Sequence, residues 1–273
     1  MDNSLLISRL EGVDHIGTSP RLSLKILEKL KDPTIDLSSI SMLLMAEQTI
    51  CAQILRAANS VYFNRGTRIN RITDAVIHLG INNVKKILFA IEMIGLFKGT
   101  PSMDGFDEVA FWKNSIGGAV VAQELAFLRR IADTETVFLA AMLRNIGVLI
   151  IRQFAPAEFV VIMSRCNEFG HPFNAACEKE VGLSHREAAR IVAVRWHLPL
   201  KITGCLNDEI TDPEVSSIRA CLDGADTILA LKGFGIWDPH FKPVVEIDPE
   251  TVETVASKAM EEVVALCNDL SIK

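Results

Sequence analysis

The feature that most constrains this chain is a long apolar stretch with a charged residue in its middle. Residues Thr134 to Phe154, TETVFLAAMLRNIGVLIIRQF, carry apolar side chains on almost every face of a helix. Such a helix is typical of a central, buried position, and Asp133 or Thr134 can cap its start. Arg144 and Asn145 interrupt the pattern, and burying them is costly unless both find partners. We therefore expect polar groups from other helices to converge on this pair.

Helical signals recur along the rest of the sequence, and no segment shows the alternating pattern of a half-buried strand. Gly80 is expected to separate two helices, and Ser184 with Glu187 forms a predicted capping box. The fold class is therefore all-α, a bundle of many helices. The expected helices cover about residues 20–30, 36–47, 50–59, 72–79, 82–97, 107–130, 134–154, 156–169, 172–181, 184–196, 214–231 and 249–270.

The segment Lys98 to Phe106, KGTPSMDGF, has the composition of a linker. We expect a subdomain boundary there. The prediction is an N-terminal subdomain of five helices over residues 1–100, a second helical subdomain over 106–240, and a C-terminal helix within 244–273.

The composition indicates a cytoplasmic protein that does not enter a membrane. The apolar run Ile87 to Phe97 is half the length of a membrane span and contains Glu92. The N-terminus does not resemble a signal peptide, and six scattered cysteines without a CxxC pair indicate reduced thiols. A zinc site at Cys166, His171 and Cys177 is disfavoured, because paired spacing and a fourth ligand are missing.

The net charge of −6 disfavours a general affinity for nucleic acid. A local basic segment is the exception, and it has two interpretations. It is either a solvated helix and loop face, which is the commoner case, or an interaction patch for a partner or for nucleic acid. Its residues are Arg65, Arg68, Arg71, Lys85 and Lys86.

Several segments, taken in order from about Ile16 to Gly235, together resemble the HD-related output domain, abbreviated HDOD. This resemblance implies a helical fold similar to that of metal-dependent HD phosphohydrolases, and a non-catalytic role in bacterial signal transduction. The segments are ILRAANSVYF, ITDAVIHLG, FWKNSIGGAVVAQELA, AAMLRNIGVLII, GLSHREAARIVAVRWHLP and LDGADTILA.

The resemblance also implies where an HD phosphohydrolase would carry its metal ligands. The first histidine corresponds to Asn114, and the adjacent His-Asp pair corresponds to Arg144 and Asn145. A further histidine used by some members corresponds to His185, and the late aspartate to Asp226. Only the last two positions keep a metal-binding side chain, so the resemblance implies a degenerate metal site.

The chemistry of these residues leads to the same expectation. A cation that activates water needs several imidazoles and carboxylates, whereas Arg144 is a permanent cation without a lone pair. We expect Arg144 to exclude a metal and to pair with Asp226, close to His185. No metal, no cofactor and no catalysis are therefore expected at this cluster.

Two interpretations of the cluster remain open. The plainer one is a vestigial polar cluster that holds helices in register. The sharper one is a pocket for an anion or a nucleotide phosphate, built from Arg144 and a protonated His185, with His197 as a further candidate for its wall.

The sequence thus predicts a non-catalytic regulatory protein that binds a signalling partner or a small ligand. One alternative is a phosphohydrolase with a displaced metal site, and another is a regulator that binds nucleic acid. Neither the signal nor the partner follows from the sequence.

Overall fold

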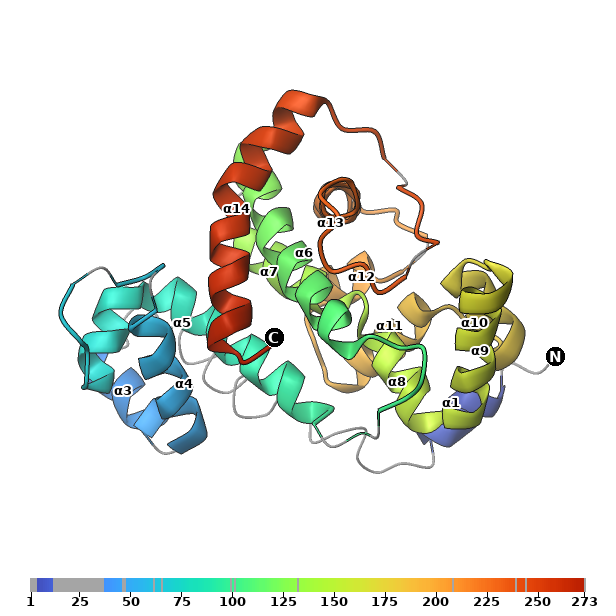
Figure 1. Ribbon diagram of the computed structural model, residues 1–273, viewed down its shortest axis with the longest axis horizontal. Helices are drawn as coiled ribbons and strands as arrows, with labels where there is room; N and C mark the ends of the chain where they lie inside the picture. Colours follow the sequence, from blue (N-terminus) through green and yellow to red (C-terminus); the bar gives the residue numbers. More distant parts are fainter. Residues whose placement is uncertain are drawn as a thin grey trace. The chain divides into compact units, whose positions relative to one another are not determined.

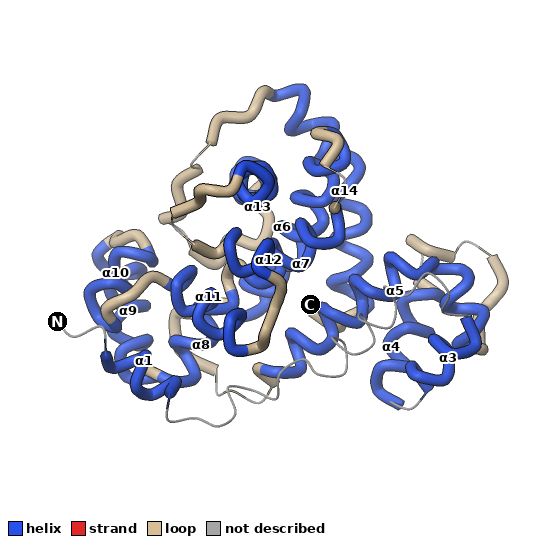
Figure 2. The backbone as a smooth tube through the Cα atoms, turned by 180° about the vertical axis from the view of Figure 1, so that it is seen from behind, coloured by secondary structure: helices blue, strands red, loops and turns tan. Residues whose placement is uncertain are grey.

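Every regular element in the described part of the chain is a helix, as Figures 1 and 2 show from opposite sides. The structure, a computed structural model, describes residues 4–11, 37–45, 48–60, 62–64, 66–98, 100, 102–131, 133–207, 209–238, 240–243 and 245–272. The predicted all-α class is confirmed. The helix expected at about residues 20–30 lies outside the described residues.

The chain divides into two compact units. The large unit comprises Met1–Gly17 and Gly99–Met260, and the small unit comprises Thr18–Lys98 and Glu261–Lys273. The division after Lys98 coincides with the start of the predicted linker. Residues 4–11 belong to the large unit, and the residues of the last helix, α14 (Pro249–Asp269), are divided between the two units.

The small unit contains α3 (Leu37–Met45), α4 (Gln48–Ala58) and α5 (Ile72–Leu96). α3 and α4 both pack against α5. Gly80 has φ +74°, and this non-helical backbone conformation interrupts α5. Glycine suits the position, because residues with a side chain rarely adopt a positive φ. The two helices expected on either side of Gly80 are therefore present as the two arms of a kinked helix.

The large unit carries the other helices and the polar cluster. Neither α1 nor α12 is predicted from the sequence, because elements of eight and six residues carry little periodicity. In chain order the helices are α1 (Ser4–Glu11), α6 (Glu108–Leu128), α7 (Thr134–Leu143), α8 (Ile146–Phe154), α9 (Pro156–Phe169), α10 (Phe173–Val181), α11 (His185–Arg195), α12 (Leu200–Cys205) and α13 (Pro213–Leu231).

Local capping explains where several of these helices begin and end. Asp107, Asp133 and Asp212 accept backbone N–H groups in the first turns of α6, α7 and α13. The capping box of α11 is half formed. Ser184 accepts the Glu187 N–H at 3.1 Å, but the Glu187 carboxylate instead accepts two hydrogen bonds from Arg190 at 2.7 Å.

The apolar stretch at the centre of the large unit is two helices rather than one. α7 and α8 are separated at Arg144 and Asn145, the two residues that interrupt its apolar pattern. By length and composition Thr134–Phe154 could span a membrane, but 78% of its most apolar window is buried inside the protein. α7 packs on α6 and α8 packs on α11, so the stretch is the core of the large unit.

The contact between α8 and α11 depends on a glycine. A Cβ atom placed on Gly147 would lie 1.7 Å from the His185 carbonyl oxygen and 2.9 Å from the Ala189 nitrogen. Both obstacles are backbone atoms, which cannot rotate away. Gly147 thereby lets α11 bring His185 close to the break between α7 and α8.

Gly147→Ala should lower the free energy of unfolding by about 3 kcal/mol or more, because the two helices must separate to admit the methyl group. Urea unfolding followed by circular dichroism measures this. Gln153→Ala, an exposed position of the same helix, is the matched control and should stay within about 0.5 kcal/mol of wild type. Equal stability of the two variants would contradict the close approach.

Candidate functional site

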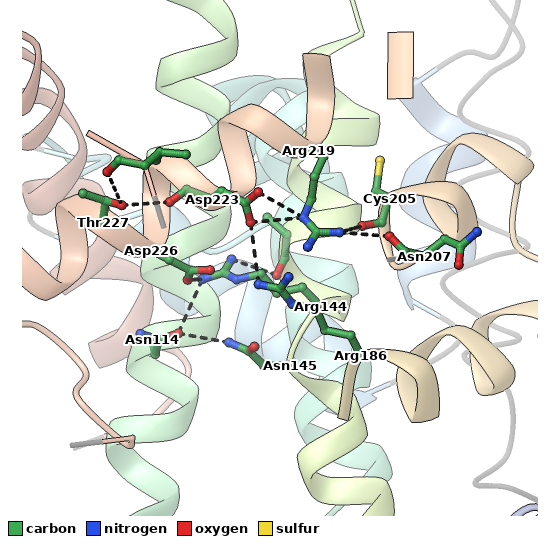
Figure 3. Close-up of polar contacts among 12 residues, drawn as sticks. Asn114, Arg144, Asn145, Arg186, Cys205, Asn207, Arg219, Asp223, Asp226 and Thr227 are labelled. Atoms are coloured by element: carbon green, nitrogen blue, oxygen red, sulfur yellow. Dashed lines mark hydrogen bonds and ion pairs between the residues drawn. The ribbon is translucent and has the colours of Figure 1, made fainter. Parts of the chain in front are cut away.

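The site is centred on the buried guanidinium of Arg144, whose residue is 3% exposed. Its Nη1 donates to the Ala141 carbonyl at 3.1 Å, and its Nη2 donates to Asn114 Oδ1 at 3.4 Å and to the Asp226 carboxylate. Figure 3 shows the Arg144 guanidinium beside the side chains of Asn114 and Asp226. The ion pair predicted from the sequence is therefore present.

Separate helices bring the predicted cluster together. The break between α7 and α8 leaves the chain free to present two polar side chains at this point. Gly118 on α6 makes room for the guanidinium, since a Cβ there would lie 2.2 Å from Arg144 Nη2. The contributors are Asn114 from α6, Asn145 from the break, His185 from the first turn of α11 and Asp226 from α13.

A second layer of charges extends the cluster. Arg219 Nε donates to both oxygens of Asp223 at 3.0 and 3.2 Å, and its Nη1 donates to the carbonyls of Cys205 and Asn207 at 2.9 and 3.2 Å. Arg186 approaches the same carboxylate only to 3.6 Å. Figure 3 shows both arginines near Asp223. The two layers contain three guanidinium groups and two carboxylates.

Arg186 and Asp223 are functional candidates that the sequence interpretation missed. A signal existed, because Asp223 precedes Asp226 by three residues and such residues share a helix face. Arg186 directly follows His185 at the start of α11. A charged residue on a helix more often faces solvent, so the sequence alone did not distinguish these two residues.

His185 is neutral in these surroundings. The residue is 7% exposed, and burial, followed by the charges of Arg186 and Arg144, lowers the pKa of its imidazole to about 3. Its Nδ1 has no hydrogen-bond partner among the described residues. An anion pocket that depends on a protonated His185 does not fit this environment.

A cavity of about 400 Å³ adjoins the cluster within the large unit. Arg144 lies behind its wall and reaches it through Asn114 and Asp226, both of which line it. His197 lies outside it and is exposed, because its positive φ of 55° turns the chain after α11. Arg144, His185 and His197 therefore do not form a single pocket.

The metal site implied by the resemblance does not fit the residues present. The implied positions hold one neutral imidazole, two carboxamides, a guanidinium and the Asp226 carboxylate, which is committed to Arg144. In the described part of the chain, no group of three or more His, Cys, Asp or Glu side chains could hold a metal ion. All six cysteines are free and five are buried, including Cys166 and Cys177, whereas His171 is exposed.

The basic residues singled out from the sequence do not form one exposed patch. Lys85 is buried, and Lys86 pairs with Glu262 at 2.8 Å. Arg68 and Arg71 are exposed, and Arg65 lies outside the described residues. The interpretation as a solvated face therefore accounts for Arg68 and Arg71, whereas Lys85 and Lys86 are held within the small unit.

Replacing Arg144 should leave a buried acid without its partner. Arg144→Met is expected to lower the free energy of unfolding by about 3–5 kcal/mol, and Arg144→Met with Asp226→Leu should recover most of it. Arg9→Met is the control, because its pair with Glu158 at 3.0 Å is 40% exposed on the arginine side and should contribute about 1 kcal/mol at most. Additive losses in the double variant would contradict the pairing.

The lowered pKa of His185 predicts a pH-dependent contribution to stability. Below pH 6.5 the unfolded chain binds a proton at His185, while the folded protein does not until about pH 3. Stability is therefore lost as pH falls through this window, by about 1.4 kcal/mol per unit. His185→Gln should lose stability less steeply, as measured by urea unfolding at pH 7, 6 and 5. Parallel profiles for variant and wild type would contradict a neutral His185.

Comparison with solved structures shows a similar fold in several bacterial proteins. An HDOD domain protein of unknown function from Geobacter sulfurreducens is 24% identical, covers 99% of this chain and 95% of its own, and has a TM-score of 0.77. A Marinobacter aquaeolei VT8 protein described as a "putative signal transduction protein" is 16% identical, with 100% and 66% covered and a TM-score of 0.78. A Shewanella amazonensis SB2B protein described as a "putative phosphohydrolase" is 21% identical, with 96% and 98% covered and a TM-score of 0.70.

Comparison of sequences gives the family. An uncharacterized protein of Treponema pallidum (strain Nichols) is 22% identical over 199 residues, which are 71% of this chain and 37% of that protein. The chain thus spans less than half the length of that relative. The family model of the HDOD domain matches residues 16–209, most of the sequence. The chain belongs to the HDOD family.

Proposed function

We propose that this protein is a catalytically silent, cytoplasmic regulator in bacterial signalling. In this proposal it acts by binding a protein partner or a small ligand. The observation that carries the proposal is the ion pair between Arg144 and Asp226, because it places a cation of the polypeptide where a related hydrolase would need an inorganic one. The membership of the HDOD family and the fold shared with the Marinobacter protein support a signalling role.

Electrostatics argues against the alternative of a phosphohydrolase. Two unit charges about 4 Å apart repel by about 4 kcal/mol at an effective dielectric near 20, and a divalent metal beside Arg144 would double this value. The remaining imidazole and carboxylate provide too few ligands to offset the repulsion. The likeness to the Shewanella protein concerns the fold. In this chain Asn114, Arg144 and Asn145 stand at positions where the resemblance implies metal ligands.

The third possibility, binding to nucleic acid, has little support from the charged surface. Lys85 and Lys86 are held within the small unit, and the chain carries a net charge of −6. Binding to DNA or RNA depends on several basic groups that face the phosphates together. A protein partner or a small ligand therefore remains the better proposal.

Metal content and hydrolysis provide the test. The purified wild-type protein should contain no stoichiometric iron, manganese or zinc by mass spectrometry, and it should not hydrolyse bis(p-nitrophenyl) phosphate or a cyclic dinucleotide with added Mn²⁺. The combined variant Asn114→His, Arg144→His and Asn145→Asp should bind Mn²⁺ in calorimetry, because it restores three ligands beside His185 and Asp226.

Each arm of this experiment can contradict the proposal. Stoichiometric metal in the wild-type protein, with turnover that chelation abolishes, would show that the protein is an enzyme. If the combined variant is folded but has no affinity for Mn²⁺, the assignment of Asn114, Arg144 and Asn145 to the metal-ligand positions of an HD phosphohydrolase is wrong. Arg190→His, whose side chain lies on α11 outside the cavity, is the control for metal binding by an added histidine.

A further inference from the structure

The cavity beside the polar cluster has the size and walls of a small-molecule site. Its volume of about 400 Å³ falls within the usual range for ligand pockets. It lies within the large unit, and α6, α10, α11, α13 and the segment after α13 contribute to it. Aromatic side chains form much of the wall, and the members are Phe173, Phe234, Trp237 and Phe241.

Arg186 gives this cavity a cation with unused donors. Its guanidinium makes no hydrogen bond to a residue that the structure describes, and its nearest carboxylate, Asp223 at 3.6 Å, already accepts two hydrogen bonds from Arg219. A guanidinium has five N–H donors and holds carboxylates and phosphates well. Arg186 is therefore the group in this wall that best suits an anion.

The charge balance around the cavity favours an anionic ligand. The pair of Arg144 and Asp226 is neutral, and Arg219 neutralises Asp223, which leaves the charge of Arg186 in excess. His185 adds no charge, because burial keeps its imidazole neutral. Lys242 and Asp238 also line the cavity and carry opposite charges, so together they leave this excess unchanged. A ligand with one carboxylate or phosphate group supplies the missing negative charge.

The uncharged polar groups suit a ligand with hydrogen-bonding edges. Asn145 is 7% exposed and lines the cavity, and its Nδ2 donates to Asn114 Oδ1 at 3.1 Å. Its Oδ1 accepts no hydrogen bond from a described residue, and His185 Nδ1 in the same wall also has no partner there. A buried polar atom such as His185 Nδ1 normally has a partner.

The aromatic groups form a connected wall. Phe173 and Trp237 meet edge to face with centroids 5.1 Å apart, and His185 lies 5.7 Å from the first ring and 6.1 Å from the second. Such rings bind planar apolar groups favourably. The cavity thus combines the guanidinium of Arg186 with an aromatic surface.

We propose that this cavity binds a small aromatic acid, with its anionic group on Arg186 and its ring against the aromatic wall. This inference rests on the proposed silent function, since it uses the same cluster without a metal. Two kinds of compound share this chemistry: aromatic carboxylates and nucleoside monophosphates. The volume of the cavity is compatible with a molecule of one or two rings.

Calorimetry on the full chain tests the proposal, with Trp237 fluorescence as a second readout. The probes are indole-3-acetate and guanosine monophosphate, compared with uncharged indole-3-acetamide and with inorganic phosphate. We expect one of the aromatic acids to bind at least tenfold more tightly than the amide and than phosphate alone. The acid that binds shows whether the ligand is an aromatic carboxylate or a nucleoside monophosphate.

Variants on one helix separate the role of Arg186 from a general loss of charge. Arg186→Gln should weaken binding of the acid at least tenfold and leave binding of the amide unchanged. Arg190→Gln, one turn further along α11 and paired with Glu187, should bind like the wild type. Ala230→Leu fills the cavity without changing its charges and should weaken both acid and amide.

The outcomes distinguish this inference from the proposed function. No binding of either acid at millimolar concentration, or equal binding to Arg186→Gln when circular dichroism shows that it is folded, would overturn the ligand assignment. The proposal of a non-catalytic regulator would be unaffected, because it is tested separately by the metal content and by the hydrolysis assays. Metal-dependent turnover in the wild type would overturn the silent function itself, whether or not an acid binds.

Discussion

A buried guanidinium in the middle of an apolar core is the constraint on which the large unit depends. Arg144 would be severely destabilising without partners, and its position at the break between α7 and α8 requires other helices to supply them. α6 supplies the room at Gly118 and the acceptor Asn114, while α13 supplies Asp226. The choice of neighbours around the central stretch therefore follows from one charge as well as from apolar packing.

The ion pair contributes more to specificity than to net stability. Buried ion pairs are often no more stabilising than apolar groups of the same volume, whereas breaking one is costly. Alternative packings of α6, α13 and the central stretch would separate Arg144 from Asp226 and are penalised accordingly. The same geometry fixes the cavity wall, because Asn114 and Asp226 each contact Arg144 on one side and line the cavity on the other.

The parts that the sequence predicts are those in which a residue departs from its local pattern. Arg144 and Asn145 stand out in an apolar helix, and Gly80 stands out among good helix formers. Arg186 and Asp223 do not stand out, since charged residues on a helix usually face solvent. Their side chains meet between α11 and α13 and are only partly exposed. His197 shows the opposite error: it is close to α11 in sequence, but the turn at its own backbone leads it away from the cavity.

A fixed cation differs from a bound metal in how a site can respond to its surroundings. A metal can be lost, exchanged or titrated through its ligands, so its charge depends on supply and pH. A guanidinium is a permanent cation, and the buried imidazole of His185 stays neutral well below pH 6 because its pKa is lowered to about 3. The electrostatic field at this cluster is therefore constant under cellular conditions. In the proposed regulator, the signal must therefore come from what binds to the surface or the cavity, since neither a metal nor a proton changes the charge of the cluster.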